Sequence, residues 1–211
     1  MKEVWFRTNE KDQAVTSLQL ACELFEKSKN EPRFWGWTII AMHKAVQDFM
    51  VLALRGSNSL RVCKDNGIKE RIWNYLDSLG EGVFSIESSK KERLRLHNFL
   101  DLYEMVKSEE WMGYYCHSKC LPADTFKDKK MYELNEYRNM LIHFIPRGTS
   151  IFIGDLLDEF KAAYEVIRFL CFESGNINLD TLEIESVVKE HLERIKSMIA
   201  AMKELLGHDR P

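Results

Sequence analysis

Apolar residues recur at steps of three and four along most of this chain, and few helix-breaking residues interrupt them. Only four prolines and ten glycines occur in 211 residues. Residues at i, i+3, i+4 and i+7 line one face of an α-helix, so this spacing predicts amphipathic helices. Strand-like alternation survives only in residues 149–153. The chain is therefore predicted to be all-α, an antiparallel up-and-down helical bundle with short connections, forming a single domain over residues 1–211.

Turn and cap residues set the predicted ends of these helices. Helices are expected over residues 14–25, 37–53, 90–107, 128–145, 154–170 and 184–205, with a shorter one over 68–79. Asp180 followed by Glu183 is typical of the cap that begins a helix, and Gly207 is expected to end the last one. Residues 57–89 and 109–127 are predicted to be less regular connections.

The composition is that of a globular protein, and it also indicates where the protein is located and which partners it binds. Hydrophobic residues make up 45% of the chain and charged residues 30%. No segment approaches the roughly 18 uncharged apolar residues of a membrane span, and the N-terminus has no signal-peptide layout. A cytoplasmic protein with no membrane partner is therefore expected. The net charge of −3 is unlike that of a generally basic nucleic-acid binder, and five scattered cysteines do not predict a disulfide framework.

Within the predicted helix over 128–145, residues 137–144 set three polar residues, Arg138, Asn139 and His143, in an apolar frame. Residues four apart lie about 40° apart around a helix axis, so Asn139 and His143 share a face, which Asn135 extends. Arg138 lies to one side of this face, but its side chain is long enough to swing toward the groove that His143 would line. Since apolar helices rarely carry such groups without partners or a purpose, this trio is the strongest candidate for a functional site.

These side chains have the chemistry needed to cleave RNA without a metal ion or another cofactor. A His titrates near neutrality and can accept or donate a proton. An Arg keeps its charge and binds phosphate through two parallel hydrogen bonds, while an Asn orients the imidazole or the substrate. Cleavage needs both a base and an acid, yet this helix offers a single His. Two copies facing across a two-fold axis would supply both, which predicts a homodimer with a composite site.

Residues 138–143, Arg-Asn-Met-Leu-Ile-His, resemble the R-x4-6-H motif of HEPN domains, in which a polar residue often follows the Arg. The flanking residues are similar to those of a bacterial HEPN subgroup, and the match covers about residues 90–170. The resemblance implies a HEPN-like helical bundle, usually dimeric, that acts as a metal-independent endoribonuclease in toxin–antitoxin or phage-defence systems. It also implies a catalytic pair, Arg138 and His143, supported by Asn139. RNA would be the substrate, and an antitoxin or another regulatory protein would be a partner.

Two features of HEPN proteins bear on whether this chain is an active and modifiable enzyme. HEPN toxins that are modified by a nucleotidyltransferase carry an H-x-Y motif, and the sequence after His143 lacks that Tyr. Other HEPN proteins have lost catalysis, so the alternative function is an inactive module that binds nucleotide, RNA or a partner protein. In a purely structural alternative, Arg138 pairs with Glu136 or Asp155, and His143 makes a satisfied bond at the edge of the bundle.

Other candidate residues have plainer interpretations. Residues 116–120 hold two cysteines and a histidine, but a closed zinc site needs four ligands, so two unpaired thiols in a loop are expected. His43 and His97 are expected to be buried or half-buried, although either could line the groove beside His143. Four aromatic residues are expected in the core or an interface rather than in base stacking: Trp111, Tyr114, Tyr115 and Phe126.

Overall fold

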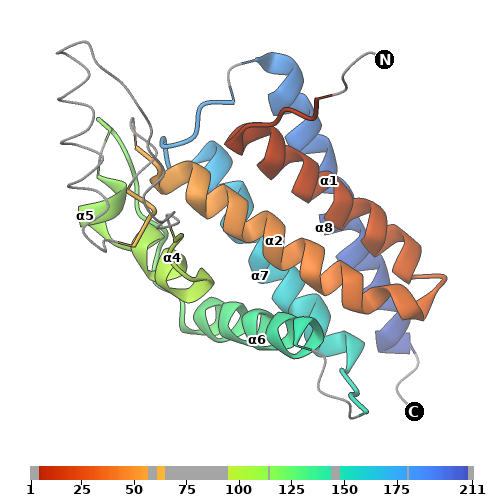
Figure 1. The fold of residues 1–211 in the computed structure, drawn as a ribbon. Helices are drawn as coiled ribbons and strands as arrows, with labels where there is room; N and C mark the ends of the chain where they lie inside the picture. Colours follow the sequence, from red (N-terminus) through yellow and green to blue (C-terminus); the bar gives the residue numbers. More distant parts are fainter. Residues whose placement is uncertain are drawn as a thin grey trace, which may run out of the picture.

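The structure, a computed structural model, describes residues 5–56, 61–64, 95–113, 115–143, 148–179 and 181–208. In chain order its elements are α1 (Glu10–Ser28), the 3-10 helix η1 (Pro32–Phe34), α2 (Trp35–Leu54), α4 (Phe99–Val106), α5 (Glu109–Met112), α6 (Thr125–Ile142), α7 (Ile153–Phe172) and α8 (Leu182–His208). These ranges contain no strand, only an isolated antiparallel bridge between Cys63 and Leu96. The predicted all-α helical bundle is confirmed (Figure 1). The helix predicted over 68–79 lies outside the described residues.

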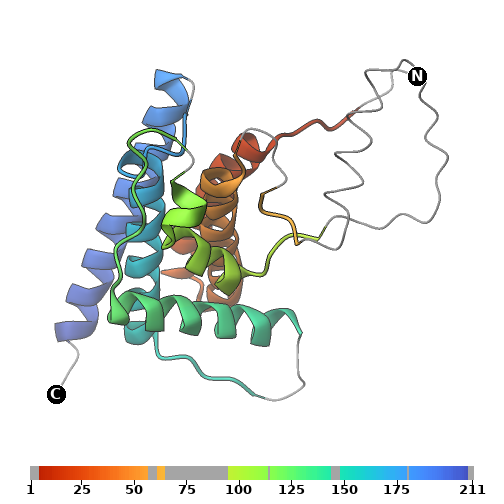
Figure 2. The ribbon, with the colours of Figure 1, turned by 90° about the vertical axis from the view of Figure 1, so that its left-hand side faces the viewer.

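Four long helices make up the body of the bundle. α1 and α2 form an antiparallel hairpin, and α7 and α8 form another (Figure 1). The two hairpins meet where α2 packs on α7 and α1 packs on α8. α6 instead crosses the body at a steep angle and packs on α2 and α7 (Figure 2). This crossing brings Arg138 and Asn139 of α6 close to residues of α2 that are distant in sequence.

The centre of the core is an aromatic cluster that joins three helices. Phe25 of α1 meets Phe160 of α7 edge to face, with ring centroids 5.3 Å apart. Trp35 of α2 lies 5.6 Å from Phe25 and 6.3 Å from Phe160. Both phenylalanines are fully buried, and such burial stabilises the fold by about 1.5–3 kcal/mol for each side chain.

α4 begins later than the sequence pattern indicates, so the helix predicted over 90–107 is wrong at its start. The described residues before Phe99 are extended, and their backbone pairs with residues 62–64: the His97 N–H donates to the Val62 carbonyl at 3.0 Å. Asn98 then caps the helix, its side-chain oxygen accepting from the Asp101 N–H at 2.9 Å. Residues 95–97 are therefore an extended segment that pairs with residues 62–64, and they do not continue α4 toward the N-terminus.

α6 begins earlier than predicted and ends earlier too. The Asp124 carboxylate accepts two N–H bonds from the first turn, so the helix starts at Thr125, inside the connection predicted over 109–127. α5 occupies another part of that connection. The last helical residue is Ile142, and His143 occupies the C-cap with its N–H bonded to the Asn139 carbonyl at 3.0 Å.

α8 also differs from its predicted ends. Thr181 acts as its cap, because its hydroxyl oxygen accepts from the Ile184 N–H at 3.2 Å; the predicted cap, Asp180, lies outside the described residues. The helix passes through Gly207, since one glycine costs a helix only about 1 kcal/mol. None of the described helices, α8 included, combines enough length and apolar character to cross a membrane.

Candidate functional site

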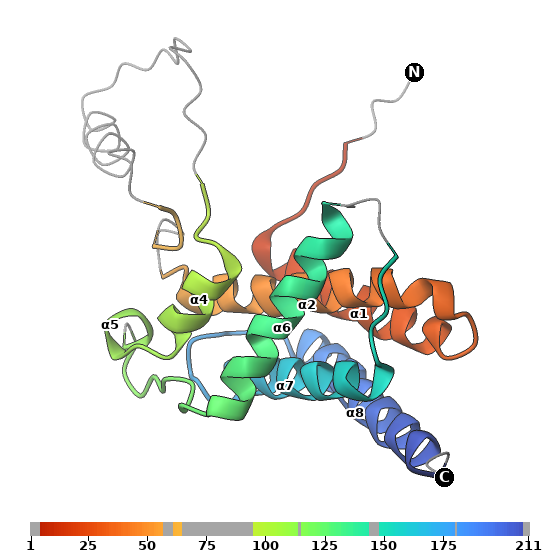
Figure 3. The same ribbon diagram turned by 90° about the horizontal axis from the view of Figure 1, so that it is seen from below.

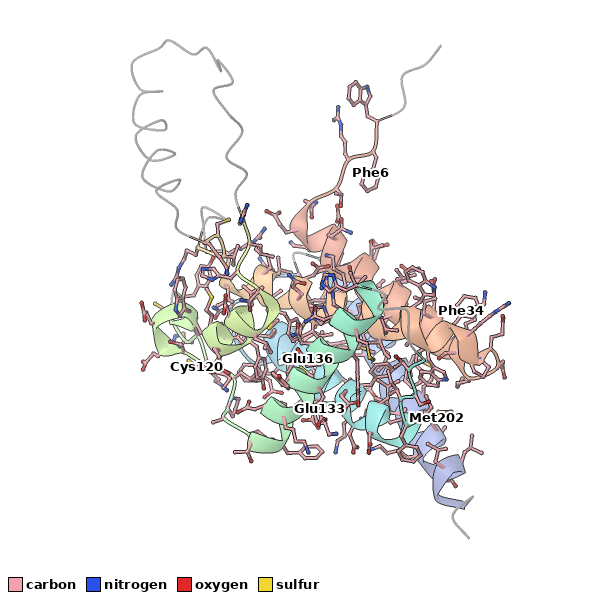
Figure 4. The ribbon with its side chains drawn as sticks, turned by 60° about the horizontal axis from the view of Figure 1, so that its bottom comes forward. Phe6, Phe34, Cys120, Glu133, Glu136 and Met202 are labelled. Atoms are coloured by element: carbon pink, nitrogen blue, oxygen red, sulfur yellow. The ribbon has the colours of Figure 1, made fainter. Side chains whose placement is uncertain are left out.

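A buried ion cluster and apolar packing hold α6 against α7. Lys130 donates hydrogen bonds to Glu133 on its own helix at 2.8 Å and to Glu159 of α7 at 3.0 Å. Glu159 is fully buried, as are Met131 and Leu134 on the inner face of α6. Figure 4 labels Glu133 along this helix, which crosses α7. The polar trio is therefore carried by a helix that the core fixes in place.

Arg138 is half-buried near the C-terminal end of α6. It donates one hydrogen bond from Nη1 to the Asn139 side-chain oxygen at 3.0 Å. In the described part of the chain it forms no ion pair with a carboxylate, so the alternative pairing with Glu136 or Asp155 is absent. Its guanidinium keeps a positive charge and further N–H groups for an anionic ligand.

His143 lies at the end of α6 and is exposed. Its imidazole has no hydrogen-bond partner among the residues that the structure describes, so the bond expected at the bundle edge is absent there. His143 and Asn139 share one side of α6, as the spacing predicts, although residues 144–147 beyond them are outside the described part.

Arg138 and Asn139 line a hollow of about 480 Å³ between α2, the start of α4 and α6. We call it the α6 hollow. It has seven polar lining residues: His43, Gln47, His97, Asn98, Asn135, Arg138 and Asn139. Its apolar lining residues are Leu96, Phe99 and Leu100. The structure therefore brings Arg138 and Asn139 to the hollow. His143 is not among the lining residues and lies at the C-cap of α6.

His43 faces the trio from α2 and is neutral at physiological pH. Burial lowers the pKa of its imidazole to about 4. The residue is 3% exposed, and its ring stacks on Phe99 with centroids 4.0 Å apart. Its Nε2–H donates to the Asn135 side-chain oxygen at 3.2 Å. The expectation that His43 is buried is confirmed. His43 lines the α6 hollow with Arg138 and Asn139 rather than a groove beside His143.

His97 reaches the same hollow from the extended segment before α4. Its Nδ1 lies 3.7 Å from a carboxylate oxygen of Asp101, which also pairs with Lys64 at 3.4 Å. Its side chain is 22% exposed, so the expected half-buried position is confirmed. The predicted helical setting is wrong, because residue 97 precedes the cap.

Two polar lining residues, Gln47 and Asn98, were not singled out by sequence reasoning. Asn98 carries a readable local signal: it stands three residues before Asp101 at the start of an apolar run, which is typical of an N-cap. Nothing in the sequence pairs either residue with α6, because that proximity arises only from the packing of α6 on α2 and α4.

The other candidates contribute no further site in the described residues. Cys116 is exposed and Cys120 half-buried, both as free thiols, and no group of three or more potential metal-ligating side chains occurs in the described ranges. Cys120 lies in the connection between α5 and α6 (Figure 4). Trp111 packs against the core, whereas Phe126 is more than half exposed; Tyr114 lies outside the described residues.

No family model matches this chain, and neither a curated protein nor a solved structure is similar to it at a significant level. A function for the chain therefore has to come from its own residues and their geometry.

The stability of the α6–α7 contact should depend on pH through Glu159. Burial raises the pKa of this carboxyl from 4.5 to about 7, outweighing the attraction of Lys130. Between these values the folded chain binds more protons than the unfolded chain, so stability falls as pH rises. Raising the pH from 5 to 8.5 should lower the free energy of unfolding by roughly 2–3 kcal/mol through this group.

Urea denaturation across this pH range measures the effect. Glu159→Gln imitates the protonated carboxyl and should flatten the pH dependence. The matched variant Glu185→Gln alters a partly exposed carboxylate that pairs with Lys189 on α8 and should leave the slope unchanged. Identical slopes in wild type and Glu159→Gln would show that Glu159 titrates normally.

Proposed function

We propose that this chain is a metal-independent endoribonuclease of the HEPN type that acts as a homodimer. The observation that carries the proposal is the setting of Arg138, which borders the α6 hollow and has no carboxylate partner in the described part of the chain. A guanidinium without a counter-ion beside a polar hollow suits a phosphate group, which accepts two parallel N–H bonds. The exposed His143 on the same helix supports a proton-transfer role.

In the proposed reaction, one imidazole accepts the proton of the ribose 2′-hydroxyl, and the oxygen attacks the adjacent phosphorus. The bond to the 5′-oxygen breaks, and that oxygen takes a proton from a second group. The products are a 2′,3′-cyclic phosphate and a 5′-hydroxyl. Arg138 stabilises the charge that builds up on the phosphoryl oxygens, and Asn139 holds the guanidinium in position.

The second proton-transfer group would be His143 of a second copy of the chain. The exposure of His143 at a helix end leaves it accessible to another subunit, and a two-fold axis would place two such imidazoles in one cleft. By the HEPN resemblance, the enzyme would work in the cytoplasm as a toxin or phage-defence effector, held in check by an antitoxin or another regulatory protein.

The purified chain should cleave RNA in the presence of EDTA and leave cyclic phosphate ends, as judged by gel electrophoresis and end-group analysis. Because the site is composite, specific activity should rise with protein concentration across the range in which the dimer forms. Arg138→Ala should lose most of this activity. Arg168→Ala, which removes a surface arginine paired with Glu173, should keep it. Undiminished cleavage by Arg138→Ala would refute the assigned role.

One observation favours a second function, an inactive module that binds nucleotide, RNA or a partner protein. Arg138 and Asn139 line the α6 hollow together with the neutral His43, whereas His143 does not. A site of this kind can bind a phosphorylated ligand without transferring a proton. Binding of RNA with no turnover would support this function, and multiple-turnover cleavage would exclude it.

A further inference from the structure

The proposed reaction needs a base beside Arg138, and His143 of the same chain does not line the α6 hollow. Two other imidazoles do, those of His43 and His97. A base acts within hydrogen-bonding distance of the proton that it removes. The ribose 2′-hydroxyl lies next to the 3′-phosphate, so the base has to lie close to the group that binds this phosphate. The position of each histidine relative to Arg138 therefore decides between them.

His43 is held on α6 next to Arg138. Its Nε2–H donates to the Asn135 side-chain oxygen at 3.2 Å, and Asn135 precedes Arg138 by three residues. Side chains three apart on a helix are neighbours, and the charge of Arg138 is accordingly among the causes that lower the pKa of His43. His97 instead faces α4, where its Nδ1 lies 3.7 Å from a carboxylate oxygen of Asp101. Of the two imidazoles, His43 is the one fixed beside the guanidinium.

The hydrogen bond to Asn135 leaves a lone pair on Nδ1 of His43. An amide oxygen only accepts, so the hydrogen of the neutral ring is on Nε2. The nitrogen of the same amide faces a carboxylate oxygen of Glu136 at 3.5 Å, which fits this orientation. Nδ1 has no hydrogen-bond partner in the described part of the chain. It is not one of the buried side-chain atoms that lack a partner there, so it is accessible from the hollow.

Burial keeps this imidazole neutral. Burial is the largest cause of the shift in the pKa of His43 to about 4; the bond to Asn135 opposes the shift, and the charges of Arg138 and Lys44 add to it. Among the described residues that line the hollow, the other imidazole is His97. The Nδ1 lone pair is therefore available at neutral pH, although such a base is weak in the free protein. A bound phosphate offsets the charge of Arg138 and so makes the imidazole more basic when the substrate is in place.

We propose that His43 is the general base of the reaction and accepts the proton of the ribose 2′-hydroxyl on Nδ1. The 2′-oxygen forms a bond to phosphorus, and the bond from phosphorus to the 5′-oxygen breaks. His143 of a second copy donates the proton that the 5′-oxygen takes up, while Arg138 binds the phosphoryl oxygens. Nδ1 releases its proton to water after the cyclic phosphate leaves. This assignment rests on the proposed ribonuclease function and adds a catalytic residue from α2.

His43→Gln removes the base and keeps its hydrogen bond. Glutamine places an amide N–H near the position of Nε2, where it can still donate to Asn135, but it has no counterpart of Nδ1. Single-turnover cleavage of a short RNA in EDTA should slow by about 10²–10⁴-fold. Affinity for the same RNA with a 2′-deoxyribose at the cleavage site, which has no attacking hydroxyl, should stay the same. Circular dichroism checks that the variant is folded.

His191→Gln is the matched control. His191 is also buried, with 8% of its surface exposed, and burial lowers the pKa of its imidazole as well. It lies on α8, which packs on α1 and α7 in the described part of the chain. The variant should cleave RNA at the wild-type rate. Equal losses in His191→Gln and His43→Gln would attribute the effect to the packing of a buried imidazole and would overturn the proposal.

Asn135→Asp changes the base without removing it. A carboxylate that accepts from Nε2–H favours the charged imidazole and so raises the pKa of His43. The kcat/KM for cleavage reports the unliganded chain. In the wild type it should not fall between pH 7 and pH 5.5, because the base stays unprotonated; in Asn135→Asp it should fall as the base takes up a proton. Parallel profiles would contradict the assignment, and this test stands even where His43→Gln does not fold.

Failure of this assignment and failure of the nuclease function give different results. Full activity in His43→Gln, with activity lost in Arg138→Ala, would retain the nuclease and remove His43 as its base. Weaker binding of the deoxy-substituted RNA at an unchanged single-turnover rate would make His43 a binding residue, which also contradicts the proposal. A wild-type chain that cleaves no RNA in EDTA would remove the nuclease and this assignment together.

Discussion

Replacing His143 with asparagine should lower the rate constant for RNA cleavage by about 10²–10⁴-fold, the usual contribution of a general acid or base. An imidazole can accept or donate a proton in such a reaction, whereas the guanidinium and the amide of the polar trio serve to bind and orient. Asparagine has a similar size and hydrogen-bonding ability but transfers no proton. Single-turnover cleavage of a short RNA in EDTA, with saturating enzyme, measures this step apart from binding.

The chain offers a matched control for this substitution. His117 is also exposed, lies in the loop between α5 and α6, and has a positive φ of 69°, a conformation that asparagine tolerates well. His117→Asn should cleave at the wild-type rate. If His143→Asn also cleaves at that rate while the Arg138 variant does not, the proton-transfer group lies elsewhere, and His97 at the α6 hollow becomes the next residue to replace.

Replacing Phe160 with alanine should destabilise the fold by about 3–5 kcal/mol, the range for a fully buried phenylalanine. The ring lies at the centre of the cluster with Phe25 and Trp35, where α1, α2 and α7 meet. Its removal leaves a cavity that the surrounding helices close only partly. The difference in free energy of unfolding, from urea denaturation followed by circular dichroism, measures the effect.

Phe6→Ala is the matched control for this stability experiment. Phe6 is 88% exposed on the arm before α1, which points away from the helices (Figure 4). Its removal should change the free energy of unfolding by less than about 0.5 kcal/mol, as expected for a surface substitution. A loss below about 1 kcal/mol in Phe160→Ala would contradict the central place of this ring in the core.

Local sequence signals accounted for the long helices but not for the short helix α5 or for all of the helix ends. The steps of three and four placed α1, α2, α6, α7 and α8 correctly, because a helix buries one stripe whatever its neighbours are. They failed before α4, where the backbone of residues 95–97 pairs with a distant segment. A long-range contact of this kind leaves no periodic trace in the sequence.

For the candidate site too, the sequence predicts one part and helix packing decides the other. The sequence alone determined that Arg138, Asn139 and His143 belong to one helix near its C-terminal end, since residue spacing sets their positions around the axis. Only the tertiary structure decided that Arg138 and Asn139 meet His43, His97 and Asn98 in one hollow. Figure 3 shows the ribbon from below, with α6 passing over α2. The angle at which α6 crosses the bundle depends on packing against α2 and α7, and that packing is a property of the whole core rather than of any one segment.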